Sequence, residues 1–139
     1  MANLSIGSNG VSLVQADKAE IRDMIAVEAI TAGQPVYQTT AGKAGVADAN
    51  AAGKQQFRGI ALKDAAAGQP VPVLKRGFIS GFVLSGVAYD GLVYLSDTAG
   101  SLADAAGTMT VNCGRVCAKT DPDLTKILYV EADWLRAWA

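Results

Sequence analysis

Histidine is absent from the 139-residue sequence. This absence removes the commonest general base, the Ser/His and Cys/His nucleophile pairs, and most transition-metal sites. Cysteine is scarce too, since only Cys113 and Cys117 are present. If their segment is a strand, their Cα atoms lie roughly 13 Å apart, which is too far for a disulfide. We therefore expect two free thiols, as in a protein that is made in a reducing cytoplasm.

Charge is low as well. Charged residues make up 18% of the chain, and the formal net charge is -1. Binding to nucleic acid or to an anionic membrane needs a cluster of Lys and Arg, which this sequence lacks. No apolar run approaches the roughly 18 residues of a membrane span, and the start lacks the basic and apolar regions of a signal peptide. The sequence predicts no nucleic-acid partner and no membrane partner.

Large side chains are few. Aromatic residues make up 6% of the chain, although 50% of it is apolar. Much of the apolar half is alanine, so we expect a thin, finely divided core. The length fits one compact domain. A surface poor in charge is common on proteins that function against a partner.

Carboxylates are the acid/base candidates that remain. The aspartates fall mostly in predicted turns, where the side chain bonds its own backbone. A glycosidase would need two carboxylates beside sugar-stacking aromatic residues, and the aromatic residues here are spread singly. The glycines lack the spacing of a phosphate-binding loop. We therefore expect no enzyme, no cofactor and no metal site. The turn aspartates are Asp48, Asp64, Asp90, Asp97, Asp104, Asp121 and Asp123.

The chain is organised around residues 59–84, which hold three apolar runs. The runs at 59–62, 71–74 and 78–84 predict three strands, with a turn at Lys75-Arg76-Gly77 before the third. In the second run the side chains alternate with the period of two that a strand requires. Pro72 cannot donate a ladder hydrogen bond, so we expect its strand at an edge of the sheet or paired on one side only.

A weak internal repeat covers much of the chain. Residues 25–73 align with residues 82–130 at a constant offset of 57. The alignment matches Val36-Tyr37 with Val93-Tyr94, and each copy predicts strands at its start (25–30 or 82–87), around Val-Tyr, and at its end. Many short strands separated by turn residues predict an all-β fold, a small β-barrel or sandwich. Further matches are Arg58 with Arg115, Ala61 with Ala118, Asp64 with Asp121 and Val73 with Val130.

The two ends lie outside this repeat. We divide the chain into an N-terminal arm and entry segment (1–24), the β-domain (25–131) and a Trp-containing tail (132–139). Residues 1–10 are extended, either as a frayed terminus or as an arm across an adjacent subunit. Residues 15–24 are interpreted as helical, with Asp17 as the cap. The tail holds both tryptophans, which either fold back to cap the barrel or insert into a partner.

Several short motifs resemble one protein family. A Gly-Ile-Ala-Leu strand at 59–62 is followed by an Ala/Gly connection, a Val-x-Val strand at 71–73 and Gly77. Segments 32–37 and 91–94 are similar to that family's Gly-x-x-Val-Tyr element. Over residues 25–118 the chain resembles the capsid decoration, or cement, proteins of tailed bacteriophages. The resemblance implies an all-β fold, no catalysis, and assembly on the outer surface of a phage head, commonly as trimers.

We therefore hypothesise a structural virion protein, made in the host cytoplasm, on the capsid exterior. It would bind the major capsid protein at subunit junctions, stabilise the shell, and associate with itself, with a trimer favoured. The alternatives are a tail or baseplate β-domain, a small carboxylate-dependent hydrolase, and a soluble β-domain whose alanine content reflects a GC-rich genome. The expected partner-contact residues are Leu4, Ile6, Val11, Trp134, Leu135 and Trp138.

Overall fold

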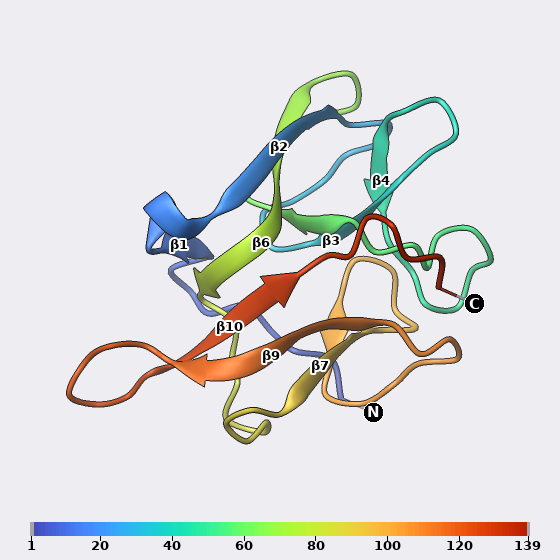
Figure 1. The fold of residues 1–139 in the computed structure, drawn as a ribbon. Coiled ribbons are helices and arrows are strands. Elements are labelled where there is room, and N and C mark those ends of the chain that lie inside the picture. Colours follow the sequence, from blue (N-terminus) through green and yellow to red (C-terminus); the bar gives the residue numbers. More distant parts are fainter. Residues whose placement is uncertain (1, 139) are drawn as a thin grey trace.

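The computed structural model describes residues 2–138 and is all-β, which confirms the predicted fold class. Its strands form one curled antiparallel sheet, a half-barrel (Figure 1). Within the described residues the helical element is a single 3-10 turn, η1 (Ala16–Lys18). The strands are β1 (Ser12–Val14), β2 (Glu20–Ile25), β3 (Pro35–Gln38), β4 (Ala44–Val46), β5 (Gly59–Ala61), β6 (Pro70–Ser80), β7 (Leu92–Leu95), β8 (Leu102–Ala103), β9 (Asn112–Ala118) and β10 (Lys126–Glu131).

The strand order repeats itself around the pair β6 and β10. The order is β4-β3-β5-β6-β10-β9-β7-β8, so the same set of pairings lies on each side of that pair. A shift of 57 residues converts Pro35–Gln38 into Leu92–Leu95, and it places β4, β5 and the start of β6 on β8, β9 and β10. Lys75 and Ala132 are themselves related by this shift, and the Ala132 N–H donates to the Lys75 carbonyl at 2.8 Å. The predicted duplication is therefore present in the pairing of the strands.

Strand β6 is one continuous element, and the predicted turn at Lys75-Arg76-Gly77 is wrong. The register against β2 shifts between Glu20 and Ile21, which leaves Lys75 as an extra residue in a bulge. Gly77 has a φ of 149°, which L side chains rarely adopt. A bulge and a glycine bend a strand without ending it. The turn-like residues therefore mark the junction of the two repeats inside one long strand.

The expected edge position of Pro72 is also wrong. The first half of β6 pairs with β2 and β5, and the second half pairs with β1 and β10. The Pro72 carbonyl accepts from Leu62 N–H at 2.9 Å. The N–H and C=O of one residue point to the same edge in an antiparallel pair. Pro72, which has no N–H, therefore faces Leu62, one residue after β5 ends at Ala61. No hydrogen bond of the β5 ladder is lost.

The helix predicted over residues 15–24 is wrong except for the short η1 turn. Residues 20–25 form β2, and the strands expected at 25–30 and 82–87 reduce to isolated bridges at Ala26, Ile30 and Phe82. Met24 is the buried residue of β2, and the other five residues of the strand are exposed. The strand is established by its pairing with residues 70–76 of β6. A shift of 57 places residues 20–25 of β2 on residues 77–82, which include residues 77–80 of β6. β2 therefore also belongs to the repeat.

The sheet can be described as two lobes. The first lobe comprises β2, β5, β3, β4 and residues 70–75 of β6, and the second comprises residues 76–80 of β6, β10, β9, β7 and β8. Figure 1 shows the first lobe in the upper part of the view and the second in the lower part. Each lobe has its own apolar interior. The smaller cluster lies in the first lobe, and the larger one fills the second lobe and the junction, reaching Phe57 and Leu74.

The two lobes close differently. In the first lobe, Ala26 forms a parallel bridge to Ala44, and the Val27 N–H donates to the Ala44 carbonyl, so the chain after β2 covers the edge of β4 directly. In the second lobe, residues 2–7 lie between β8 and the chain after β6, through bridges Asn3 to Ala103 and Ile6 to Phe82. We call residues 2–7 the arm. The division into segments 1–24, 25–131 and 132–139 stays a prediction, although β1 and β2 join the sheet.

Candidate interaction surfaces

The carboxylates of Asp48 and Asp121 accept from backbone N–H groups of their own turns, as the sequence predicts, and those of three other turn aspartates accept from more distant backbone groups. The Asp48 carboxylate accepts from Asn50 N–H, and that of Asp64 accepts from Ala32 N–H at 2.8 Å. The carboxylates of Asp97, Asp104 and Asp121 accept from the N–H groups of Thr108, Ala2 and Thr125. Each bond satisfies a loop donor. These five carboxylates thus bond to backbone donors rather than converge on a shared site.

Residues 2–138 contain no group of three or more His, Cys, Asp or Glu side chains that could hold a metal ion. They also contain no helix that is long and apolar enough to cross a membrane. Cys113 and Cys117 are free thiols on β9. Complete burial raises the pKa of the Cys113 thiol well above its ordinary value, and partial burial raises that of Cys117. Neither thiol has the lowered pKa of a reactive nucleophile.

One hollow of about 240 Å³ brings together polar side chains of β9, β10 and the tail. Glu131 and Asp133 line it, together with Arg115. The Glu131 carboxylate accepts from the Tyr129 hydroxyl at 2.7 Å and pairs with Arg76 at 3.6 Å. The Asp133 carboxylate accepts from the Leu135 N–H. Both carboxylates thus have structural partners, as ion pairs and turns provide.

The arm carries two of the expected contact residues. Leu4 is half-buried against the larger core, and its N–H donates to the Leu102 carbonyl at 2.8 Å. Ile6 is 40% exposed. Its Cδ1 packs against Gly33 of the first lobe, where a Cβ would collide with it. Val11 contacts the same glycine. The structure therefore gathers Leu4, Ile6 and Val11 along one path that joins the two lobes.

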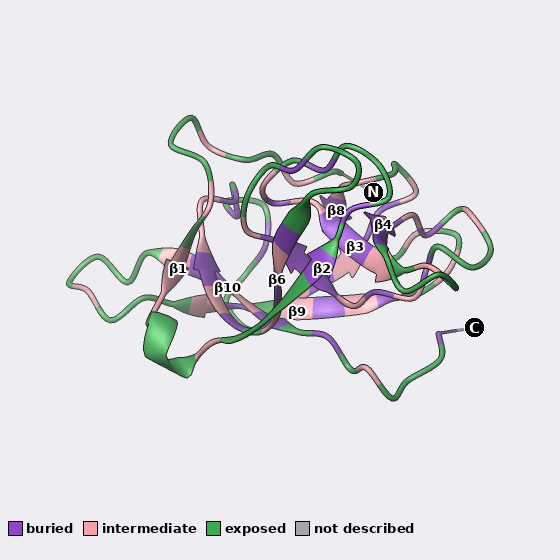
Figure 2. Cartoon of the chain, turned by 90° about the horizontal axis from the view of Figure 1, so that it is seen from above, coloured by how far each residue is buried: buried purple, intermediate pink, exposed green. Residues whose placement is uncertain are grey.

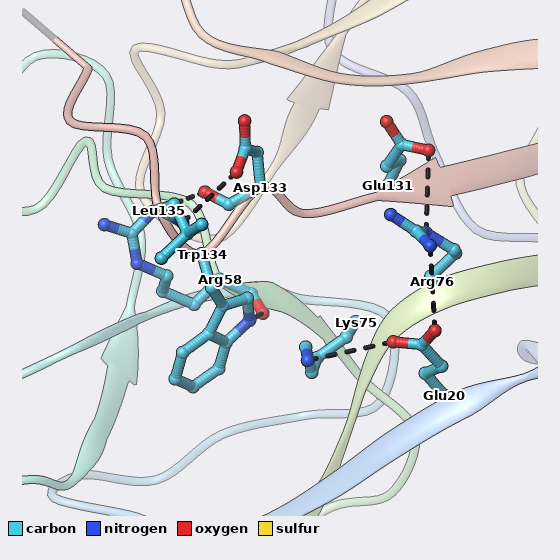
Figure 3. Close-up of polar contacts among 8 residues, drawn as sticks. All are labelled: Glu20, Arg58, Lys75, Arg76, Glu131, Asp133, Trp134 and Leu135. Atoms are coloured by element: carbon cyan, nitrogen blue, oxygen red, sulfur yellow. Dashed lines mark hydrogen bonds and ion pairs between the residues drawn. The ribbon is translucent and has the colours of Figure 1, made fainter.

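The tail carries the other three, and it folds back onto residues 55–58. Trp138 is only 7% exposed, with its backbone held by Gln55 and Gln56 side chains. Trp134 is half-buried, and its indole N–H donates to the Arg58 carbonyl at 2.9 Å (Figure 3). Leu135, between them, is 98% exposed. The tail thus presents one leucine to solvent on a backbone that both tryptophans fix.

Charged groups surround the face of Trp134. Glu20 pairs with Lys75 and Arg76, each at 3.7 Å (Figure 3). Lys75 Nζ lies 5.5 Å from the centre of the Trp134 ring, and the Arg22 guanidinium lies 5.4 Å from it. Such exposed pairs contribute little individually, about 0–1 kcal/mol. They link β2, β6 and the tail at the junction of the lobes.

The sequence prediction of a helix over residues 15–24 missed a second apolar surface. Ile21, Ile25 and Val27 are 46%, 41% and 43% exposed. Met24 and Ala26 are buried, so Ile21 and Ile25 share the opposite face of β2 with Asp23, and Val27 follows in the bend after the strand. Most of β2 is exposed (Figure 2). Ile21 also lines a mostly apolar groove with Val11. We call Ile21, Ile25 and Val27 the β2 row. Residues 20–27 do not alternate between polar and apolar types, and the signal for a strand was limited to the β-branched residues Ile21, Ile25 and Val27.

β2 also has an open backbone edge. Among the described residues it pairs only with β6. An open edge can pair with a strand of another chain, and charged residues along it restrain such pairing. Here Glu20, Arg22 and Asp23 supply these charges. The edge therefore carries an apolar row and a charged border together.

A comparison with protein families adds the decisive observation. The sequence model of the family described as structural cement protein (E217 gp24/Pam3 gp6) matches residues 2–130. The chain belongs to this family of phage cement proteins. Membership makes it a structural protein of the virion that associates with the capsid shell. No curated protein sequence matches it.

The family match includes one candidate surface, the β2 row, and excludes the other, the tail. It includes the arm and the β2 row, although the resemblance in the sequence had covered only residues 25–118. It ends at Val130, so Trp134, Leu135 and Trp138 lie outside it. A structural family also suggests that the chain is not an enzyme. The site of interest in this cement protein is therefore a contact surface.

Proposed function

We propose that this cement protein is a decoration protein that binds the outer surface of a phage capsid at junctions between subunits of the major capsid protein. Binding to the assembled shell alone stabilises that shell by mass action. The proposal includes self-association, with a trimer favoured, and synthesis in the host cytoplasm. The observation that carries it is the family match over residues 2–130.

Two surfaces support shell attachment. The first is Leu135, which is held on a fixed backbone and is 98% exposed. Burying a leucine side chain contributes about 1.5–3 kcal/mol, which corresponds to roughly ten-fold or more in affinity. Each further copy in an oligomer adds avidity. Trp134 and Trp138 position this leucine and would contact the partner only at their exposed margins.

The second surface is the β2 row together with the neighbouring groove at Val11. Ile21 and Ile25 lie on one face of β2 with Asp23 between them, and Val27 follows just after the strand, so the surface is an apolar strip that holds one carboxylate. Apolar surface removed from water contributes on the order of 25 cal/mol per Å², less the cost of immobilisation. Among the expected contact residues, Leu4 and Ile6 lie in the arm and act mainly within the oligomer.

The test uses two exposed leucines of similar character. Leu135→Asp and the control Leu124→Asp, at a residue that is 55% exposed, are each added to heads that lack the protein, and occupancy is measured. We expect Leu135→Asp to lower occupancy at least about ten-fold and Leu124→Asp to leave it unchanged. Equal occupancy for both variants rejects the role of the tail.

Removing residues 2–10 and, separately, ending the chain after Glu131 extends the test to both termini. Unchanged occupancy in both deletions excludes the ends as contacts and leaves the β2 row. Wild-type protein found on tails or baseplates rather than in many copies on the head lattice contradicts decoration and favours another virion component. Light scattering of the free protein determines whether it is a trimer.

A further inference from the structure

The second lobe is completed by a segment that does not belong to the repeat. In the first lobe the chain that follows β2 reaches β4 by itself, through Ala26 and Ala44. In the second lobe the equivalent segment, residues 81–83, is separated from β8 by the arm. Without the arm, the second lobe would have two unpaired backbone edges, one at β8 and one at residues 81–83. The first lobe has no such pair of open edges, because Ala26 and Ala44 meet directly.

The bonds that hold the arm are mostly backbone bonds. On the β8 side, Leu4 N–H donates to the Leu102 carbonyl and Asp104 N–H donates to the Ala2 carbonyl at 3.1 Å. On the other side, Val83 N–H donates to Ser5 at 2.8 Å, and Gly7 N–H donates to Gly81 at 2.7 Å. Any copy of the arm supplies the same groups. The apolar anchor is modest, because Leu4 is half-buried and Ile6 is 40% exposed.

One short exposed turn joins the arm to β1. Gly10 N–H donates to the Gly7 carbonyl at 3.0 Å, and Ser8, Asn9 and Gly10 are exposed. Gly10 has a φ of 72°, and a Cβ added to it would have no atom within 4 Å. If the turn opens, four residues span up to about 13 Å. The turn therefore has the length, exposure and composition of a hinge.

We propose that the arm is exchanged between copies, so that residues 2–7 of one chain complete the second lobe of a neighbour. Exchange of an identical element regenerates every contact and opens only the hinge. The contact is heterologous, since the arm of one copy meets β8 of another, and such a contact forms a ring when the rotation between neighbouring copies closes. Exchange thus supplies a route to a cyclic trimer. This inference concerns the free protein and does not depend on attachment to a shell.

The experiment exploits the bridge between Asn3 and Ala103. The bonds at Leu4 and Ala2 flank this pair, which makes it a non-hydrogen-bonded pair with close Cα atoms. In a background carrying Cys113→Ala and Cys117→Ser, one chain carries Asn3→Cys and a second carries Ala103→Cys. The two are co-expressed, purified and treated with a thiol oxidant. Exchange predicts a covalent product of twice the mass of one chain on a non-reducing gel, because only an arm in trans brings the thiols together.

The first lobe provides the matched control. Ala26→Cys and Ala44→Cys on separate chains occupy the equivalent closure, where no exchangeable arm intervenes, and we expect no product of double mass. A single chain carrying both Asn3→Cys and Ala103→Cys distinguishes the two cases as well: an arm bound within its own chain gives an intrachain disulfide, and an exchanged arm gives a disulfide between chains. Covalent multimers support exchange, whereas a product that remains one chain in mass at all concentrations overturns it. Equal double-mass product from the first-lobe control overturns it as well, since collision would then explain both.

Discussion

The two lobes share a strand order but differ in what fills and closes them. The first lobe encloses a small cluster rich in alanine, including Ala26, Ala44, Ala61 and Ala65, and closes through its own chain. The second encloses leucine, valine and phenylalanine side chains and needs the arm. A duplicated unit can therefore keep its pairing pattern while its closure changes. The small side chains let the edges of the first lobe meet directly, whereas the larger core of the second lies beneath an added segment.

The larger core also joins the lobes, which leads to the largest expected effect. Phe57 precedes β5 in the first lobe, is fully buried, and packs in the larger cluster. Phe57→Ala should lower the free energy of unfolding by about 3–5 kcal/mol. The control Val36→Ala, within the smaller cluster, should cost about 2 kcal/mol. Urea unfolding followed by tryptophan fluorescence and by circular dichroism measures both.

We expect the two signals to coincide in each variant, because one core spans the junction. Separate transitions in Phe57→Ala, with part of the strand signal retained after the tryptophan signal is lost, would show that the lobes unfold independently. The comparison would then describe two domains rather than one.

A glycine in the first lobe gives the next largest effect. Gly59 has a φ of 149°, and a Cβ there would lie 2.5 Å from the Leu74 carbonyl oxygen and collide with Val73. The repeat aligns Gly59 with Val116, and in the second lobe the close approach lies instead at Gly114, where a Cβ would collide with the Tyr129 carbonyl oxygen. Gly59→Ala should cost about 2–4 kcal/mol. Thermal unfolding measures it against Gly42→Ala, at a positive φ in open space, for which we expect about 1 kcal/mol. Equal losses would contradict the close approach.

Much of this architecture could be predicted from the sequence. The offset of 57 residues located the Val-Tyr strands at Val36 and Val93, because a buried strand keeps a local apolar pattern wherever it lies. The bonds of Asp48 and Asp121 were predictable for the same reason, since they stay within a few residues. Asp64 and Asp104 bond instead to Ala32 and Ala2, which no local pattern predicts. The tail was left with two interpretations, and the structure shows both tryptophans packed back onto the chain.

The remainder depends on pairing between distant segments. Lys75-Arg76-Gly77 has the composition of a turn, but partners on both sides keep β6 extended through it. The β2 residues contain helix formers, and pairing with β6 overrides that local preference. The closure of the second lobe by Asn3 and Leu4 leaves no local signal, because backbone bonds form with any side chain.

Two arginines that the repeat aligns separate the roles of the lobes further. Arg58 donates to the carbonyls of Phe57 and Asp133 at 3.2 Å and of Arg136 at 3.1 Å, which ties the tail to the first lobe. Arg115 donates instead to the Asp90 carbonyl. Arg58→Met should cost about 1–2 kcal/mol and increase acrylamide quenching of the tail tryptophans. Arg115→Met should leave the quenching unchanged. Increased quenching in both variants would show that the tail does not depend on Arg58.

The smallest expected effect concerns the aligned pair Asp64 and Asp121. Asp64 reaches a separate loop at Ala32, whereas Asp121 accepts from the hydroxyl and N–H of Thr125 within its own turn. These bonds, first that of the hydroxyl, lower the pKa of Asp121. Because the folded pKa is lowered, the stabilisation is present above the unfolded pKa and is lost as the pH falls through the folded value.

Thr125→Val removes the hydroxyl and keeps the N–H, so the pKa of Asp121 should rise toward its ordinary value in an NMR titration. Thr110→Val, at an exposed threonine elsewhere in the second lobe, is the control and should leave that pKa where it is in the wild type. The same Asp121 pKa in both variants would mean that the turn does not depend on this hydroxyl. A rise confined to Thr125→Val would show that the loop between β9 and β10 is stabilised from within, whereas its counterpart in the first lobe depends on a bond to a distant loop.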